Sequence, residues 1–206
     1  MILHIHKNSM SKAKVVLVGA ANSGKTSIVG RYVSGEFLST TMPTTQPAFS
    51  QKRVNYYGKE VSLEIWDTAG QEQYHALSPL YYRDADIGII VFDLTDQSSF
   101  IKSKQWVNEL RQARGDGISM FLVGNKSDLL SIRTVSLETS HQFASSIGAE
   151  VFETSAKTGE NIEMLFSSIV KSIASKDSSV MSYTPRRNRS SVKFDNVVVE
   201  NKGCSC

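Results

Sequence analysis

The segment Gly19–Thr26 combines residue types whose spacing suits the binding of phosphate groups. It reads Gly-Ala-Ala-Asn-Ser-Gly-Lys-Thr and fits the P-loop pattern G-x-x-x-x-G-K-[ST], between an apolar run and a helical stretch. In this pattern, backbone N–H groups and a helix N-terminus point at phosphate oxygens. Lys25 adds a positive charge near the β- and γ-phosphates, and the Thr26 hydroxyl can ligate Mg²⁺. The alternative is an ordinary glycine-containing turn. The residues expected to contact a nucleotide here are Ala21, Asn22, Ser23, Gly24, Lys25, Thr26 and Ser27.

A second motif, Asp67–Gln71, follows a stretch in which apolar and polar residues alternate as in a strand. A carboxylate at the end of a strand beside a P-loop helps to hold the metal, so we assign Asp67 to Mg²⁺. Gly70 lets the backbone approach a γ-phosphate and donate an N–H group, and Gln71 is placed to orient an attacking water. Taken alone, this motif is equally compatible with a simple turn.

Two further motifs, Asn125–Asp128 and Ser155–Lys157, predict that the base is guanine. Guanine presents its N1–H and its amine side by side, and the carboxylate of Asp128 can accept from both. Adenine has an acceptor at N1 and no amine at C2, so it would leave this carboxylate unpaired. The Ala156 N–H can donate to the guanine carbonyl. Either motif alone is compatible with a hydrophilic turn, but their order on successive strand ends favours guanine. The expected base contacts are Asn125, Lys126, Asp128, Ser155, Ala156 and Lys157.

Strand-length apolar runs alternate along the chain with amphipathic helical stretches, which predicts βαβ units and a mostly parallel sheet. In such sheets ligands bind outside the carboxyl ends of the strands, where the motifs above lie. The predicted strands cover residues 14–19, 61–66, 87–93, 118–124 and 151–154, and the predicted helices cover 24–33, 98–114, 136–147 and 161–175.

Composition excludes several classes of protein. The chain has 206 residues, of which 40% are hydrophobic and 21% charged, so wholesale disorder is excluded. No apolar run reaches the roughly 18–20 residues that span a bilayer, and the first residues do not resemble a secretory signal. The two cysteines, Cys204 and Cys206, cannot build a disulfide framework or a cysteine-based zinc site. We therefore expect a protein of a reducing compartment.

Charge is distributed unevenly between the body of the chain and its end. Residues 176–206 hold six cationic and three anionic residues, which leaves 17 of each sign before them. A neutral body argues against nucleic acid as a partner. The helical periodicity ends near residue 176, beyond which Ser, Arg and Asn predominate. We expect a flexible N-terminal extension (1–11), a folded domain (12–175) and a flexible tail (176–206).

Taken together, these motifs resemble the Rab (Ypt) small GTPases of the Ras superfamily. The similarity rests on the P-loop, Pro43-Thr44, the segment Trp66–Glu72, both base motifs and the ending Cys204-Ser-Cys206. It covers residues 12–175 and the extreme C-terminus. It implies an α/β fold, the G domain of P-loop NTPases, with a six-stranded, mostly parallel sheet and helices on both faces. It also implies a switch that binds GTP with Mg²⁺, hydrolyses it to GDP slowly without an activator protein, and recruits effectors in vesicle traffic.

The resemblance assigns roles to further residues. Gln71 and Lys25 become the catalytic pair. Thr44 becomes the effector-loop residue that ligates Mg²⁺ when GTP is bound, although its neighbours Thr40, Thr41 and Thr45 leave this assignment open. Phe37 packs against guanine, with ordinary core packing as the alternative. Residues 37–48 and 70–82 become two switches that the γ-phosphate orders.

The ending Cys204-Ser-Cys206 resembles the doubly geranylgeranylated terminus of Rabs, and two lipid chains give stable membrane anchoring. The alternative is a pair of idle thiols or a redox pair. The resemblance implies guanine nucleotide, an exchange factor, a GTPase-activating protein, effectors and a GDP-dissociation inhibitor or escort protein as partners of a monomer. Residues 74–79, together with 81–84, are most similar to Rabs of early endosomes, so we expect the cytoplasmic face of such membranes, with cycling through the cytosol.

Two departures from the family pattern bear on activity. Ala21 stands where glycine is frequent, and its methyl group could crowd the catalytic water, so we hypothesise slower hydrolysis. The run Thr44–Pro47 replaces the usual effector-loop sequence, so effector choice cannot be borrowed from relatives. A second hypothesis is therefore a nucleotide-locked scaffold with negligible turnover. A third, a metabolic P-loop kinase, would need an acceptor site and a lid, and the sequence encodes neither.

Overall fold

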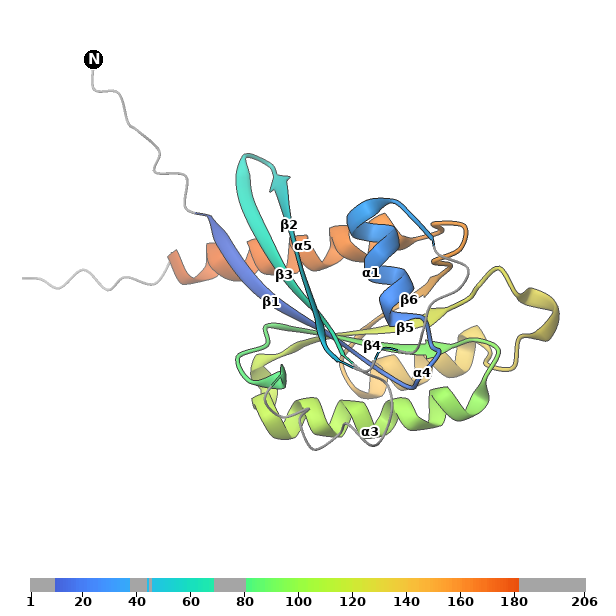
Figure 1. Ribbon diagram of the computed structural model, residues 1–206. Helices are drawn as coiled ribbons and strands as arrows, with labels where there is room; N and C mark the ends of the chain where they lie inside the picture. Colours follow the sequence, from blue (N-terminus) through green and yellow to red (C-terminus); the bar gives the residue numbers. More distant parts are fainter. Residues whose placement is uncertain (1–9, 38–43, 45, 69–80, 182–206) are drawn as a thin grey trace, which may run out of the picture.

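Six strands form one sheet in the order β2-β3-β1-β4-β5-β6 in the computed structural model of the protein (Figure 1). The structure describes residues 10–37, 44, 46–68 and 81–181. β2 runs antiparallel to β3, and the other neighbouring strands pair in parallel. The strands are β1 (Ser11–Val18), β2 (Ala48–Tyr56), β3 (Lys59–Asp67), β4 (Ile87–Asp93), β5 (Ser119–Asn125) and β6 (Glu150–Thr154).

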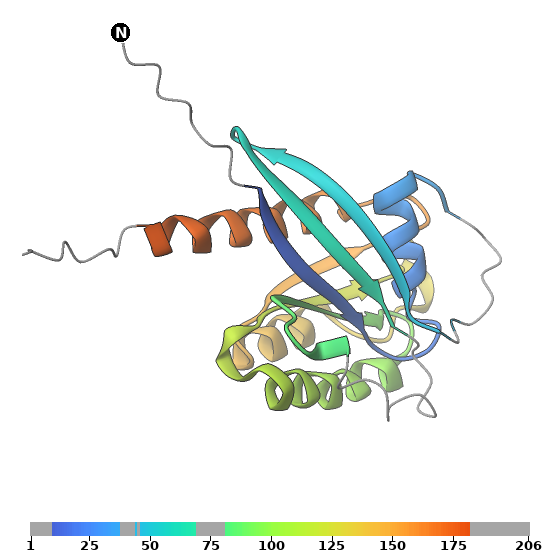
Figure 2. The same ribbon diagram turned by 60° about the vertical axis from the view of Figure 1, so that its left-hand side comes forward.

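The helices cover both faces of this sheet. α1 and α5 pack on one face, and α3 and α4 pack on the other (Figure 2). The predicted architecture, a mostly parallel sheet between two layers of helices, is confirmed. The elements are α1 (Lys25–Ser34), α3 (Gln97–Arg114), α4 (Leu137–Ser146) and α5 (Ile162–Met181), with the short 3-10 helices η2 (Gly115–Gly117) and η3 (Leu130–Ile132).

β4 contributes to both hydrophobic cores, as β1 and β5 also do, and all of its residues are buried. Ile87, Ile89 and Val91 pack in the core under α1 and α5, whereas Ile90 and Phe92 pack in the core under α3 and α4. A parallel strand that is covered on both faces has little need for polar residues. This burial explains why the sequence shows β4 as one continuous apolar run.

The structure differs from the sequence predictions at the start of β1, which is Ser11 instead of residue 14, and also at one edge strand and one helix end. β2 was not predicted, because it lies at the edge of the sheet and most of its side chains are exposed or half-buried. α5 runs through Met181, beyond the predicted end at Ser175. The intervening residues include no Gly or Pro that would end a helix.

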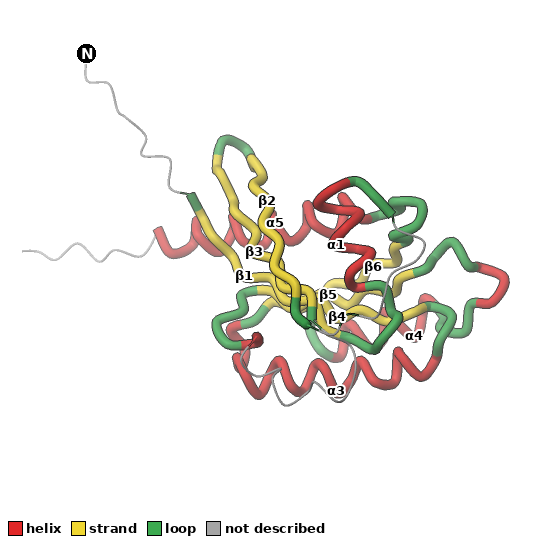
Figure 3. Tube along the Cα trace, viewed as in Figure 1, coloured by secondary structure: helices red, strands yellow, loops and turns green. Residues whose placement is uncertain are grey.

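Parallel pairing gathers the loops that matter for function. The loops that follow β1, β5 and β6 lie on one side of the molecule, near the start of α1 (Figure 3). No helix within the described ranges is long and apolar enough to cross a bilayer. Residues 1–9 and 182–206, which hold most of the two predicted terminal extensions, lie outside the described residues.

Candidate nucleotide-binding site

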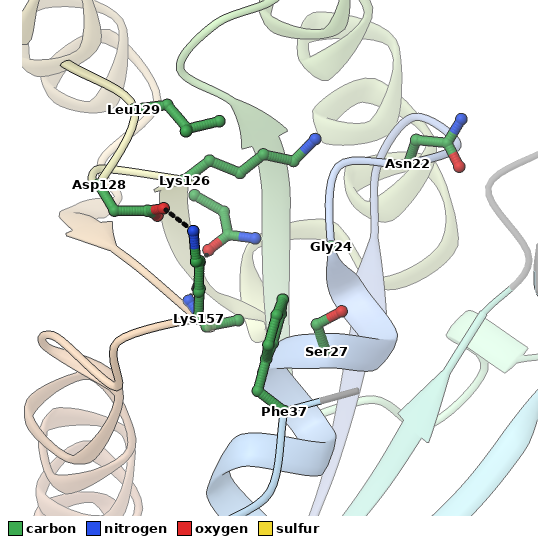
Figure 4. A pocket seen from close by; sticks show the side chains of 10 residues that line it. Asn22, Gly24, Ser27, Phe37, Lys126, Asp128, Leu129 and Lys157 are labelled. Atoms are coloured by element: carbon green, nitrogen blue, oxygen red, sulfur yellow. Dashed lines mark hydrogen bonds and ion pairs between the residues drawn. The ribbon is translucent and has the colours of Figure 1, made fainter. Parts of the chain in front are cut away.

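A cavity of about 340 Å³ opens at the carboxyl ends of the strands (Figure 4). This volume is within the range of roughly 300–1,000 Å³ that is common for small-molecule sites. All of its lining residues except Leu129 were predicted from the sequence to contact a nucleotide. The lining residues are Asn22, Gly24, Ser27, Phe37, Asn125, Lys126, Asp128, Leu129, Ala156 and Lys157.

The loop between β1 and α1 approaches its neighbours too closely for side chains at its two glycines. A Cβ atom on Gly19 would lie 2.0 Å from the Val91 carbonyl oxygen, and one on Gly24 would lie 2.1 Å from Asn125 Nδ2. Gly24 is also the N-cap of α1 with a φ of 94°, and it offers no side-chain hydrogen bond to the helix. The first N–H groups of α1 therefore remain available to an anion.

Lys25 is buried beneath this loop. Its ammonium donates to the carbonyl oxygens of Gly19, at 2.8 Å, and Ala20, at 2.9 Å. Burial lowers the pKa of Lys25 to about 8, and the nearby charge of Asp67 only partly opposes this effect. A phosphate beside Lys25 would provide the missing negative charge.

Three oxygen donors meet next to Lys25. The Thr26 hydroxyl donates to Asp67 Oδ2 at 2.6 Å and lies 2.7 Å from the Thr44 hydroxyl. Asp67 Oδ1 is buried and has no hydrogen-bond partner among the described residues. Burial raises the pKa of Asp67, against the lowering effects of the Thr26 hydrogen bond and the Lys25 charge. Hard divalent cations prefer such oxygen donors, so this cluster fits Mg²⁺.

Asn125 joins the P-loop to the loop after β6. Its Nδ2 donates to the Ser23 carbonyl at 2.9 Å, while its Oδ1 accepts from the Ala156 N–H at 3.2 Å and from the Thr154 hydroxyl at 3.3 Å. Asn125 is buried at the end of β5, where parallel pairing places it opposite Thr154. One side chain thus fixes the distance between the predicted phosphate and base contacts.

Asp128 lies on the side of the cavity that the base is expected to occupy. Its Oδ1 accepts from the Ser155 hydroxyl at 2.6 Å, and its Oδ2 lies 3.9 Å from Lys157 Nζ. Figure 4 shows Asp128 and Lys157 on one side of the cavity and Asn22 on the other. Phe37 lines the cavity and also packs against the core under α1 and α5. The core-packing interpretation of Phe37 is thus confirmed, and its contact with guanine stays a prediction.

The remaining predicted residues lie elsewhere. Ala21 is exposed on the P-loop, whereas Ser23 and Ser155 are fully buried. Their hydroxyls donate to the Ala20 carbonyl and to Asp128 Oδ1, respectively. Leu129, which the sequence analysis missed, follows Asp128 directly, and no motif pattern marks it. Several predicted residues lie outside the described residues, namely Gly70, Gln71, Cys204 and Cys206.

Comparison with known proteins identifies relatives over most of the chain. The sequence profile of the Ras family matches residues 14–175. Ras-related protein Rab-21 of Geodia cydonium is 48% identical over 162 residues, which are 79% of this chain and 71% of that protein. The human protein of the same name is 48% identical over 158 residues, 77% of this chain and 70% of its own length. That of Dictyostelium discoideum is 44% identical over 168 residues, 82% and 79% of the two chains.

These matches agree with the architecture and with the motifs at the strand ends. The predicted G-domain fold and the predicted Rab resemblance are both confirmed. The chain therefore belongs to the Ras family and is a Rab small GTPase, which binds GTP with Mg²⁺, hydrolyses it to GDP and works with exchange factors, activator proteins and effectors.

Proposed function

We propose that the guanine base occupies the cavity against Asp128 and Ala156, with the phosphates along the P-loop. The observation that carries this proposal is the Asn125 side chain, which bonds Ser23 on the phosphate side and Ala156 on the base side. A nucleotide that contacts both sides must extend from the P-loop to the loop after β6, which Asn125 holds together. This supports a protein that recognises a whole guanosine phosphate rather than a free phosphate.

Lys25, Thr26, Thr44 and Asp67 serve the phosphate end of this site. When the nucleotide binds, the Lys25 ammonium moves from the loop carbonyls to phosphate oxygens. Their negative charge stabilises the ammonium, which burial disfavours. The two hydroxyls and the unpartnered Asp67 oxygen hold Mg²⁺ directly or through water. When bound, Mg²⁺ neutralises the charge that develops on the phosphate oxygens.

Gln71 orients the attacking water, and the Gly70 N–H donates to the γ-phosphate. Both residues lie outside the described residues, and the support for their roles is the Asp67–Gln71 motif directly after β3. Gln71→Leu keeps GTP binding but lowers activator-stimulated single-turnover hydrolysis by about 100-fold or more, because the water loses its orienting group. Hydrolysis that survives in this variant would remove Gln71 from the mechanism.

The base assignment is tested with Asp128→Asn. An amide in place of the carboxylate donates to the C2 carbonyl of xanthine but faces the amine of guanine with a donor. We expect the preference for GTP over XTP to reverse by about 100-fold in competition binding. Asp96→Asn is the matched control, because Asp96 caps α3 away from the cavity and should leave the preference unchanged. Unchanged selectivity in Asp128→Asn would contradict the assignment.

Cys204 and Cys206 anchor the protein to endosomal membranes through two geranylgeranyl groups, and a GDP-dissociation inhibitor or escort protein extracts it into the cytosol. The Cys-x-Cys ending supports this part, since two chains bind membranes far more stably than one. The test images the tagged full-length protein, with Cys204→Ser/Cys206→Ser as the variant and Ser205→Ala as the control. The double variant should become cytosolic, and an endosomal marker separates this membrane from others in vesicle traffic.

A further inference from the structure

Arg31 lies on α1 and bonds three backbone carbonyls that belong to two separate loops. Its Nε donates to the Ala156 carbonyl at 2.8 Å, and its Nη2 donates to the Lys157 carbonyl at 2.6 Å. Its Nη1 donates to the Gly35 carbonyl at 2.7 Å, just beyond the end of α1. Arg31 does not line the cavity, so it acts only through the segments that it holds.

Both segments carry walls of the cavity. Ala156 and Lys157 line it directly, and Gly35 precedes by two residues Phe37, which also lines it. The Gly35 N–H in turn donates to the Arg31 carbonyl at 3.1 Å, so the end of α1 and the Arg31 side chain form one closed unit. A shift of Arg31 would therefore move both the base loop and the Phe37 segment.

We propose that Arg31 is a positioning residue that sets the place of the Ala156 N–H relative to the guanine O6 atom, and through it the lifetime of the bound nucleotide. The proposal rests on the base assignment made above. Asn125 Oδ1 accepts from the Ala156 N–H at 3.2 Å, a long bond whose proton guanine O6 would share, while Arg31 Nε donates to the carbonyl oxygen of the same residue from the α1 side. Ala156 is thereby held at both of its backbone polar groups.

The guanidinium group is suited to this role. It is planar, always charged and presents its donors in a rigid fork, so one side chain can serve three acceptors at once. A lysine at this position can direct its point charge at one carbonyl, but it has no planar fork to reach all three in fixed directions. Arg31→Lys is therefore expected to retain part of the function, and Arg31→Ala none of it.

The experiment compares three nucleotides in competition against fluorescent GDP. In 6-thio-GDP the O6 atom is replaced by sulfur, a larger and weaker acceptor that a fixed N–H rejects. IDP lacks only the amine that faces Asp128. In Arg31→Ala the preference for GDP over 6-thio-GDP should fall about fivefold and GDP release should accelerate about tenfold, while the preference for GDP over IDP stays constant. Arg31→Lys should give intermediate values.

Arg114→Ala is the matched control, because Arg114 also uses its Nε to hold a loop carbonyl, that of Ala85 at 2.8 Å, but far from the cavity. An unchanged 6-thio-GDP preference in both Arg31 variants would overturn the proposal, as would an equal fall of the IDP preference or the same change in Arg114→Ala. If the wild-type protein itself did not distinguish GDP from IDP, the base assignment to Asp128 would fail instead. Should Arg31→Ala not fold, Arg31→Lys carries the test.

Discussion

The ammonium of Lys126 lies 2.6 Å from Asp93 Oδ2, so the end of β4 holds a side chain of the loop that follows β5. Asp93 is nearly buried, and its other oxygen accepts from the backbone N–H of Thr95 at 2.8 Å and from the Thr95 hydroxyl at 2.7 Å. Lys126 itself has a φ of 68°, in the left-handed region that its residue type rarely adopts. The ion pair therefore helps to keep Lys126 in an unfavourable conformation along the cavity wall.

Asp93→Asn removes the charge that fixes Lys126 but keeps an oxygen for Thr95. We expect GDP to dissociate about three- to tenfold faster, since a half-buried ion pair of this kind contributes about 1 kcal/mol. Release of fluorescent GDP after addition of excess unlabelled GDP measures this. The control is Asp86→Asn, because Asp86 accepts from the Lys14 backbone N–H just before the other end of β4. Equal release rates in the wild type and Asp93→Asn would count against the role of the ion pair.

Gly24 and Gly35 lie at the two ends of α1. Comparing them separates the effect of a positive φ from the effect of a close neighbour. Both are left-handed, with φ of 94° and 76°. A Cβ on Gly35 would meet nothing within 4 Å, whereas one on Gly24 would meet Asn125 Nδ2 at 2.1 Å. Gly35→Ala should therefore lower the free energy of unfolding by about 1 kcal/mol, from backbone strain alone.

Gly24→Ala should lower the free energy of unfolding by about 3 kcal/mol and also abolish GDP binding, because Asn125 must leave its bonds to Ser23 and Ala156. Urea unfolding of both variants, with GDP binding measured beside it, checks the difference. If the two variants were equally stable and bound GDP equally well, the close approach of Gly24 to Asn125 would matter neither for stability nor for GDP binding.

Elements of the fold were predictable where burial requires a recognisable pattern of apolar residues in the sequence. β4 was predicted with its observed bounds because both of its faces are covered and every residue is apolar or buried. β2 was missed because an edge strand with exposed side chains carries no such pattern. The end of α5 was placed too early because the hydrophobic periodicity of the sequence ends near residue 176, whereas the helix runs through Met181.

The residues of the candidate site likewise fall into those that a sequence motif predicts and those that no motif marks. The P-loop and base motifs were found because backbone approach and base recognition demand fixed residue types at fixed spacing. Arg31 and Leu129 were missed because neither belongs to such a pattern. Arg31 and Ala156 are 125 positions apart in the chain. Their contact depends on how α1 packs against the loop after β6, and local spacing does not encode that packing.

Ala21 tests the switch against the nucleotide-locked scaffold. Its methyl group is exposed on the P-loop. In the same loop, the side chain of Ser23 is buried and the two glycines have none. If that methyl crowds the catalytic water, Ala21→Gly should accelerate single-turnover GTP hydrolysis about fivefold, with and without an activator protein, and leave GDP affinity unchanged. Phosphate release that is equally fast in both proteins would discard the crowding hypothesis. Negligible turnover of the wild type even with an activator would favour the scaffold.

Tyr32 links α1 to α5 and to the edge strand. Its ring stacks on Phe166 with centroids 3.6 Å apart, and Lys52 Nζ lies 3.7 Å from its ring centroid. Only 4% of Tyr32 is exposed. Burial, together with the negative charge of Glu163, raises the pKa of Tyr32 to about 12, from 10.0 in a free tyrosine.

Because the folded pKa of Tyr32 is the higher one, its contribution to stability is complete below pH 10 and is lost as the pH rises toward 12. In that interval the unfolded chain releases the phenolic proton while the folded chain keeps it. Between pH 9 and pH 11 the free energy of unfolding should therefore fall by about 1 kcal/mol more in the wild type than in Tyr32→Phe, which has no proton to release. Urea unfolding at the two pH values measures this difference, and the other tyrosines and the lysines are common to both proteins. Parallel pH profiles would mean that the ring of Tyr32 is open to water when ionised, so that its packing against Phe166 does not control its titration.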